Sequence, residues 1–119
     1  MEKTIFVVDD NGTNLSIADA MLEDQYSVIT MSSAAKMFFL LGKIRPDLIL
    51  LDIEMPEMNG YEAIGVLKAD DKNKDIPVIF LTAMTDADIE SKCLELGAEQ
   101  IILKPFSQND LLSIVGNHI

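Results

Sequence analysis

The chain has 119 residues, 49% of them apolar, and its length and composition are typical of one compact domain with one core. Twenty acids against nine bases give a formal net charge of −11. This charge repels phosphate backbones and anionic lipid, so nucleic-acid binding by this chain alone is not expected. No apolar stretch reaches the ~18 residues of a spanning helix, and no signal peptide is recognisable. We therefore expect a cytoplasmic protein without a membrane anchor.

Two residues with reactive side chains are interpreted as structural. Cys93 is the only cysteine, which excludes an intrachain disulfide, and it lies at helical spacing from Ile89 and Leu96. We expect it to be a small core residue. His118, the only histidine, lies next to the end of the chain and is interpreted as a solvated terminal residue.

The chain begins with alternating apolar and amphipathic segments, the pattern of βαβ units in a parallel sheet. The apolar run at residues 5–8 predicts a buried strand. A helical period follows, with an apolar face at positions 15, 18, 21 and 22, and Thr13 or Asn14 can cap its start. The second strand is predicted at residues 26–31.

The middle of the chain repeats the same alternation. A helix is predicted at residues 33–44, because the residue before Pro46 disfavours a helical backbone. A strand at residues 47–51 follows, and after a turn-rich loop a helix is expected at residues 61–69. The polar segment 70–75 is expected to be a loop.

The last part supplies two further strands and two helices. Pro77 opens the fourth strand, which ends at Thr82, and the fifth strand covers residues 101–103. Two sequence pairs fit the capping-box spacing and place helix starts near Asp86 and Gln108: Thr85 with Asp88, and Ser107 with Asp110. The last helix is expected to bury Leu111, Leu112 and Val115. Together the elements predict a doubly wound α/β sandwich of five βα units.

One residue of the second predicted helix breaks its amphipathic pattern. Phe39 falls on the same face as Lys36 and Lys43, away from the apolar face, so its ring is expected to face solvent. Single exposed apolar residues are common, and we favour no function for it. A contact with a partner or with a second copy is the alternative.

Four of the apolar runs stop at residues that suit magnesium or a phosphoryl group. They end at the Asp9-Asp10 pair, at Asp52, at Thr82 and at Lys104. The carboxyl ends of parallel strands lie side by side, so these residues are predicted to share one pocket. Three converging carboxylates repel one another, and a hard cation such as Mg²⁺ would offset that repulsion.

The same residues suit phosphoryl transfer, in which positioning and charge neutralisation provide most of the catalysis. Asp52 is expected to be the nucleophile that forms an aspartyl phosphate. Mg²⁺ would be held by Asp10 and Asp52, with Asp9 acting directly or through water. Phosphoryl oxygens would be met by Lys104, by the Thr82 hydroxyl and by the Ala83 N–H.

At this point the sequence resembles a known family, the receiver domains of two-component response regulators, over its whole length. Four segments resemble the successive signatures of that family, and the second is highly specific: residues 5–10 (IFVVDD), 46–60 (PDLILLDIEMPEMNG), 76–83 (IPVIFLTA) and 97–106 (GAEQIILKPF). The resemblance implies a five-stranded parallel sheet of order 2-1-3-4-5 with helices on both faces. It also implies a cis peptide bond between Lys104 and Pro105.

The resemblance also implies a role for each site residue. Asp52 would be the phospho-acceptor, Asp9 and Asp10 the metal acids, and Glu54 the donor of a backbone carbonyl to the Mg²⁺ ion. Thr82 would be the switch hydroxyl and Lys104 the phosphate-binding lysine.

By the same resemblance the chain would be a phosphorelay signalling module rather than a turnover enzyme. The phosphodonor would be a phosphohistidine on a sensor histidine kinase or a histidine phosphotransfer protein, docking near the first helix. Residues 1–119 would form a single receiver domain without an output domain. A homodimer through the fourth helix, fifth strand and fifth helix is a candidate assembly.

The chain departs from the family pattern at the switch. The family commonly has an aromatic residue three positions before the lysine, where this chain has Ile101. We expect Thr82 to move toward the phosphoryl group and Ile101 to repack against the fourth helix with a smaller change of surface. In the family that the chain resembles, the positions two after the acceptor and two after the threonine influence the lifetime of the phosphate. These positions hold Glu54 and Met84 here, and we expect Glu54→Ala to change the hydrolysis rate.

Two other functions are compatible with parts of the pattern. A small phosphatase of haloacid-dehalogenase type also uses an aspartate nucleophile, a hydroxyl, a lysine and magnesium. Its first motif needs a second acid where this chain has Asn11. A flavodoxin-like binding module has the same architecture, but it would need a phosphate loop rich in hydroxyls and glycines instead of Asp9 and Asp10.

Overall fold

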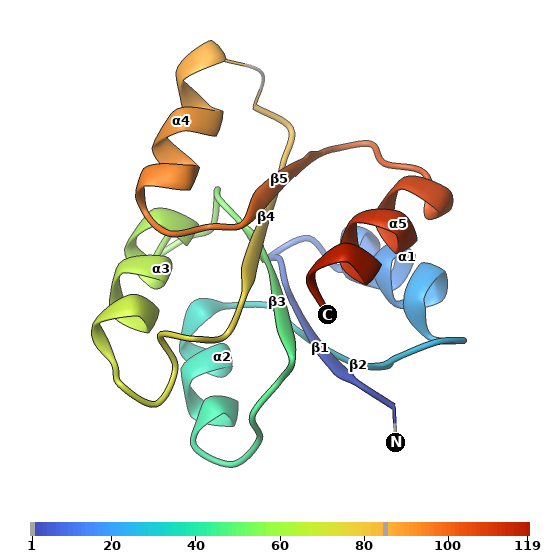
Figure 1. Ribbon diagram of the computed structural model, residues 1–119, viewed down its shortest axis with the longest axis horizontal. Helices are drawn as coiled ribbons and strands as arrows, with labels where there is room; N and C mark the ends of the chain where they lie inside the picture. The colour runs from blue at the N-terminus through green and yellow to red at the C-terminus, as the bar shows by residue number, and fades with distance from the viewer. Residues whose placement is uncertain (1, 85) are drawn as a thin grey trace.

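Five parallel strands form one sheet in the computed structural model, which describes residues 2–84 and 86–119 (Figure 1). The strands lie in the order β2-β1-β3-β4-β5, as predicted. They are β1 (Thr4–Val8), β2 (Ser27–Met31), β3 (Leu48–Asp52), β4 (Val78–Thr82) and β5 (Gln100–Leu103). This confirms the doubly wound α/β fold.

Helices cover both faces of the sheet, with α1 and α5 on one side and α2, α3 and α4 on the other (Figure 1). They are α1 (Gly12–Leu22), α2 (Ala34–Leu41), α3 (Gly60–Ala69), α4 (Ala87–Glu95) and α5 (Gln108–His118). Each helix follows one strand and crosses back over the sheet, so all strand carboxyl ends reach the same edge.

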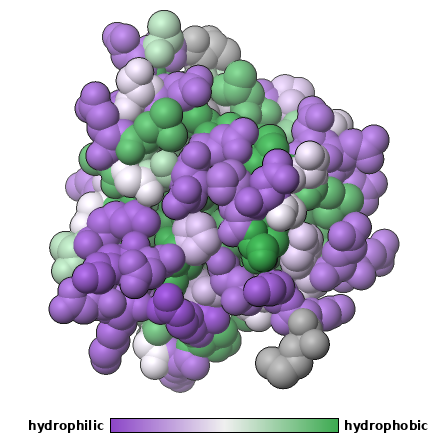
Figure 2. Space-filling model, viewed as in Figure 1, coloured by the Kyte–Doolittle hydropathy of each residue, from purple (hydrophilic) through white to green (hydrophobic). Residues whose placement is uncertain are grey.

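The core consists of two layers divided by the sheet. In β1, Ile5 and Val7 face α1 and α5, whereas Phe6 and Val8 face the three helices on the other side. β3 and β4 are buried along their whole length, because a central parallel strand is covered on both faces. On the outside, polar residues cover much of the surface in the view of Figure 2, with apolar residues visible between them.

Helix α1 begins earlier than the sequence predicted. Its cap is Asn11, whose Oδ1 accepts the N–H groups of Thr13 at 2.9 Å and Asn14 at 3.1 Å. The prediction of Thr13 or Asn14 as the cap was wrong, since both lie inside the first turn. α2 ends at Leu41, before the predicted end at Ile44, with Gly42 as its C-cap.

The two predicted capping boxes have different outcomes. Ser107 caps α5, because its Oγ accepts the Asp110 N–H at 3.1 Å. Thr85 lies outside the described residues, and α4 begins at Ala87 after Asp86, whose side chain forms no cap hydrogen bond. A complete capping box, Asn59 with Glu62, opens α3 and was not predicted.

Four smaller predictions can be compared with the structure. Cys93 is fully buried, as expected of a core residue, and the cis peptide bond at Lys104-Pro105 is present. Leu112 is only partly buried. His118 is not a free terminal residue: its Nε2 lies 3.1 Å from Gln100 Oε1, because the last turn of α5 reaches the start of β5.

Among the described helices, none has the length and apolar character needed to cross a bilayer.

Candidate functional site

The strand register brings the predicted site residues to one level at the carboxyl edge. Val8 pairs with Leu51, so Asp9 and Asp52 are the next residues of adjacent strands. On the other side, Asp52 pairs with Leu81, directly before Thr82. Thr82 in turn pairs with Leu103, directly before Lys104. The ends of four strands therefore place two carboxylates, a hydroxyl and an ammonium group next to one another.

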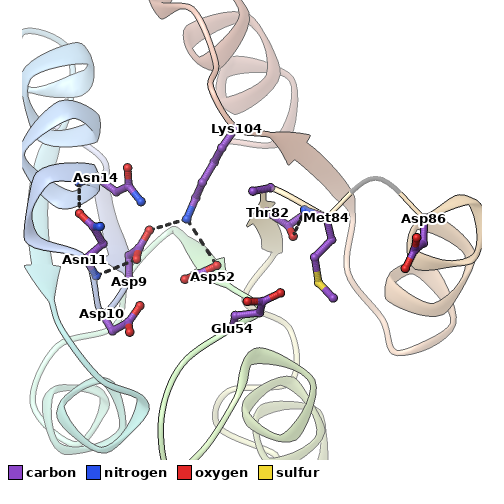
Figure 3. Close-up of a pocket in the computed structure, with 11 residues that line it drawn as sticks. Asp9, Asp10, Asn11, Asn14, Asp52, Glu54, Thr82, Met84, Asp86 and Lys104 are labelled. Carbon is purple, nitrogen blue, oxygen red and sulfur yellow. Dashed lines mark hydrogen bonds and ion pairs between the residues drawn. The ribbon is translucent and has the colours of Figure 1, made fainter.

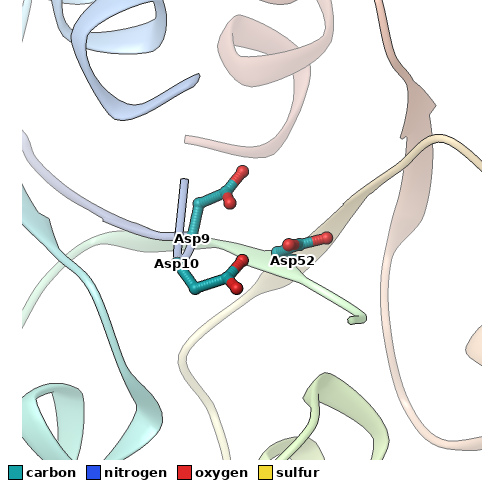
Figure 4. A group of neighbouring side chains, drawn as sticks. All are labelled: Asp9, Asp10 and Asp52. Carbon is teal, nitrogen blue, oxygen red and sulfur yellow. The ribbon is translucent and has the colours of Figure 1, made fainter. Parts of the chain in front are cut away.

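Three carboxylates gather at this edge (Figure 4). Asp9 is 1% exposed and Asp52 is 7% exposed, whereas Asp10 is open to solvent. One oxygen from each lies within 4.8 Å of the others. The Asn11 N–H donates to Asp9 Oδ1 at 2.9 Å, so the start of α1 fixes the orientation of this carboxylate. Such a set of hard oxygen donors suits Mg²⁺.

Lys104 provides the nearest positive charge to these acids (Figure 3). Its Nζ donates to Asp9 Oδ2 at 2.7 Å and lies 3.4 Å from Asp52 Oδ1. Burial, and then the charge of Asp9, raise the pKa of Asp52 to about 6, while Lys104 acts in the opposite direction. One lysine thus offsets only part of the negative charge in the pocket.

Thr82 completes the arrangement from β4. It is 1% exposed, and its Oγ1 accepts the Met84 N–H at 3.0 Å, so the hydroxyl is held by the loop that leads to α4. All of the predicted catalytic and metal residues line one cavity of about 550 Å³: Asp9, Asp10, Asp52, Glu54, Thr82, Ala83 and Lys104. The size and polar walls of this cavity suit a phosphate-sized anion together with a cation.

Ile101 is not brought into this cavity. It is partly buried on β5 and lines a separate groove of about 390 Å³ between α4 and β5, together with Ile89 and Leu103. Met84 and Asp86 line both spaces. The loop after β4 is therefore the part of the structure that touches both the acidic cavity and the groove at Ile101.

Sequence reasoning missed three residues of the cavity wall, namely Asn11, Asn14 and Asp86. An asparagine directly before a helical period, as at Asn11, is a cap signal that could have been noticed. No sequence signal identifies Asp86, which lies on the α4 side of the cavity (Figure 3). The direct ion pair between Lys104 and Asp9 was also not predicted.

The structure defines the class of the protein: an open parallel α/β sheet with a ligand cavity at its carboxyl edge, lined by acids, a hydroxyl and a lysine. The family model of the response regulator receiver domain matches residues 5–116. The chain therefore belongs to the receiver domain family.

Known proteins similar to this chain include two curated relatives. A probable cyclic di-GMP phosphodiesterase of Vibrio cholerae is 38% identical over 98% of this chain and 26% of its own length. The polar-differentiation response regulator DivK of Brucella anthropi is 32% identical, over 100% of this chain and 98% of its own. The chain thus spans about a quarter of the first relative and nearly all of the second.

A solved structure extends the comparison to the metal. The receiver domain of the sensor histidine kinase PA1611 from Pseudomonas aeruginosa is 28% identical, covers 99% of this chain and 98% of its own, and has a TM-score of 0.89. That structure contains a magnesium ion coordinated in the active-site cleft. A receiver domain is a signalling module, so membership of this family favours the signalling prediction over the phosphatase and flavodoxin-like alternatives.

Proposed function

We propose that this chain is a phosphorelay switch that accepts a phosphoryl group on Asp52 with the help of Mg²⁺. The observation that carries the proposal is the position of Asp52. Its carboxylate is almost buried, shares a cluster with Asp9 and Asp10, and lies 3.4 Å from Lys104 Nζ. A purely structural role does not explain why three acids converge here, because converging carboxylates repel and lose hydration.

The donor set fits a bound Mg²⁺ ion. The carboxylates of Asp9, Asp10 and Asp52, and by resemblance the backbone carbonyl of Glu54, would hold it. When bound, the ion supplies positive charge that allows an anionic phosphoryl group to approach these carboxylates. This fit rests on the chemistry of the oxygen atoms and on their separation of at most 4.8 Å.

Each side chain of the cavity would have its own role in the transfer of the phosphoryl group. A carboxylate oxygen of Asp52 attacks the phosphorus atom while the bond from phosphorus to the donor nitrogen breaks and the nitrogen keeps the electron pair. Lys104 Nζ, now paired with Asp9 and Asp52, would instead pair with a phosphoryl oxygen. The Thr82 hydroxyl and the Ala83 N–H would donate to another oxygen.

The partners follow from the same proposal. The phosphodonor would be a phosphohistidine on a sensor histidine kinase or a histidine phosphotransfer protein, bound near α1 beside the acids. The output would be a change in the surface of α4, β5 and α5, which could also serve as a homodimer contact. Residues 1–119 would act as a single receiver domain in the cytoplasm.

Intact-mass spectrometry after incubation with acetyl phosphate tests the proposal. The expected result is the gain of one phosphoryl group in the presence of Mg²⁺, little gain in EDTA, and none in the Asp52→Asn variant. Peptide mapping then identifies the modified residue. Modification of Asp9 would support the phosphatase alternative, and an unmodified Asp52 under every donor would overturn the proposal.

A further inference from the structure

Helix α2 presents a surface that takes no part in the acidic cavity. Phe39 is 65% exposed, the largest value among the exposed large apolar side chains of the described residues. Lys36 lies one turn before it in α2, and Lys43 directly follows the Gly42 C-cap of that helix. Lys43 Nζ is 4.6 Å from the centroid of the ring, and Lys36 Nζ donates to Ser32 Oγ at 2.9 Å. We call these three side chains, Lys36, Phe39 and Lys43, the Phe39 surface.

A groove lies directly beside the exposed ring. It has a volume of about 420 Å³, and its wall is formed by Leu15 of α1, by Thr30 and Met31 of β2, and by Leu40 of α2, together with Lys36 and Phe39. None of these residues lines the acidic cavity. The wall is mostly apolar, and Lys36, one of the two lysines, forms part of it. The groove can therefore accommodate an apolar side chain next to a carboxylate.

The segment that supplies most of the groove wall has the opposite charge to the rest of the chain. Residues 25–46 contain Lys36, Lys43 and Arg45 and no aspartate or glutamate. Since the chain has nine bases in all, the other residues carry six bases against all twenty acids. The Arg45 guanidinium donates to the carbonyl oxygen of Lys72, and Arg45 does not line the groove. The cations of this segment that lie beside the groove and the exposed ring are Lys36 and Lys43.

We propose that the Phe39 surface docks a short acidic segment of a partner protein, with an apolar side chain of that segment inserted into the groove. A symmetric contact between two copies is disfavoured, because it would place identical lysines opposite one another. Lipid bilayers and DNA are extended anionic surfaces that would also meet the acidic remainder of the chain and be repelled. A short segment meets only the local cations.

The direct test is an NMR titration of the full chain with a defined probe. The probe is a short synthetic peptide of aspartate and glutamate residues around a central pair of leucines. We expect amide shift changes concentrated in residues 30–43, with a Kd of about 0.1–1 mM, since the patch is much smaller than a standard interface. The affinity should fall with rising salt, because the lysines are exposed.

Matched variants and ligands make the result decisive. Phe39→Ser, and separately the pair Lys36→Glu with Lys43→Glu, should each weaken binding about tenfold. Val66→Ser, which removes another exposed apolar side chain in α3, should leave it unchanged. Equal binding of a peptide with asparagine and glutamine in place of the acids would overturn the proposal. So would the absence of shift changes on α2, or binding to phosphatidylglycerol vesicles without binding to the acidic peptide.

Discussion

Asp52 is the proposed phospho-acceptor, and its ionised carboxylate also lowers the stability of the folded protein. It ends a fully buried strand, and its carboxylate lies in a cluster with Asp9 and Asp10 that one lysine only partly neutralises. Its pKa of about 6 means that the folded chain holds a proton on this residue more tightly than the unfolded chain does. An ionised Asp52 therefore destabilises the fold in the absence of a cation.

Replacing Asp52 by asparagine should stabilise the protein in EDTA. At pH 7.5 we expect the free energy of unfolding to rise by about 1–3 kcal/mol, because the charged form is disfavoured by burial and by Asp9. In the parent protein, Asp52 lowers the free energy of unfolding progressively as the pH rises from about 4 to about 6. The difference between parent and variant should therefore vanish below about pH 4, where Asp52 is protonated in both the folded and the unfolded chain. Urea unfolding of both proteins at pH 7.5 and pH 4 measures this. A variant less stable than the parent at pH 7.5 would contradict the interpretation.

Gly60 supports Asp52 from the start of α3. A Cβ atom at this position would lie 2.9 Å from Ile53 Cα and from a ring carbon of Phe80, and still closer to the backbone carbonyl oxygen of Asp52. Two of these neighbours are backbone atoms that cannot move aside cheaply. The absence of a side chain therefore lets α3 approach the end of β3 closely.

Substitution of Gly60 by alanine should destabilise the protein by about 2–4 kcal/mol and also slow the phosphorylation of Asp52, whose backbone must shift. The matched control is Gly65→Ala in the same helix, where an added Cβ meets nothing within 4 Å. That change should be neutral or stabilise by up to about 1 kcal/mol. Denaturant unfolding of the two variants gives the comparison, and equal effects would refute the packing argument.

At the scale of elements, the sequence predicted every strand and helix, and it misplaced mainly their ends. Buried strands are recognisable because they are continuous apolar runs, as in residues 48–51. Helix starts depend on which side-chain oxygen reaches a free N–H, and this geometry is decided by the fold. Asn11 therefore replaced the predicted caps of α1, and the Asn59–Glu62 capping box was overlooked.

The candidate site was predictable for a related reason. A parallel sheet converts sequence position at strand ends into spatial proximity, so Asp9, Asp52, Thr82 and Lys104 could be grouped without coordinates. The pairing of Lys104 with Asp9 could not be predicted, because it depends on side-chain reach. The same holds for the Met84 N–H bound to Thr82 Oγ1, and for the separation of Ile101 from the cavity.

Strand β5 and helix α4 enclose the groove in which Ile101 lies, and Ile101→Ala tests whether this packing transmits the phosphorylation signal. Beryllium fluoride, a phosphoryl mimic, should shift the amides of α4 in the parent protein. We expect the alanine variant to lose at least about half of these α4 shifts while retaining the shifts near Asp52, because Met84 connects the two spaces. Unaltered α4 shifts in the variant would show that Ile101 is not part of the switch.

At the scale of the whole molecule, the net charge of −11 is distributed unevenly. All twenty acids lie outside residues 25–46, and five of them line the cavity, so the Phe39 surface is a small cationic area on an otherwise acidic domain. General screening by salt should stabilise such a molecule slightly, whereas a bound divalent ion should act at the cavity alone.

Magnesium should therefore raise the melting temperature beyond the effect of ionic strength. At ten times the Kd of the ion, binding adds about 1.4 kcal/mol, which corresponds to about 5 °C for a domain of this size. The check is differential scanning calorimetry in MgCl₂ against NaCl of equal ionic strength. Asp10→Asn, at an exposed position, should remove most of the difference. An equal rise in both salts would exclude a specific ion site.

The division of the cavity among four strands has a consequence for biosynthesis. The ammonium group of Lys104 comes from the end of the edge strand β5, which is also the last of the five strands to be synthesised. A nascent or partly folded chain can carry Asp52 and still lack the group that faces it across the cavity. Phosphorylation of Asp52 would then require a completely assembled sheet, and the phosphodonor would not phosphorylate chains in which β5 has not yet joined it.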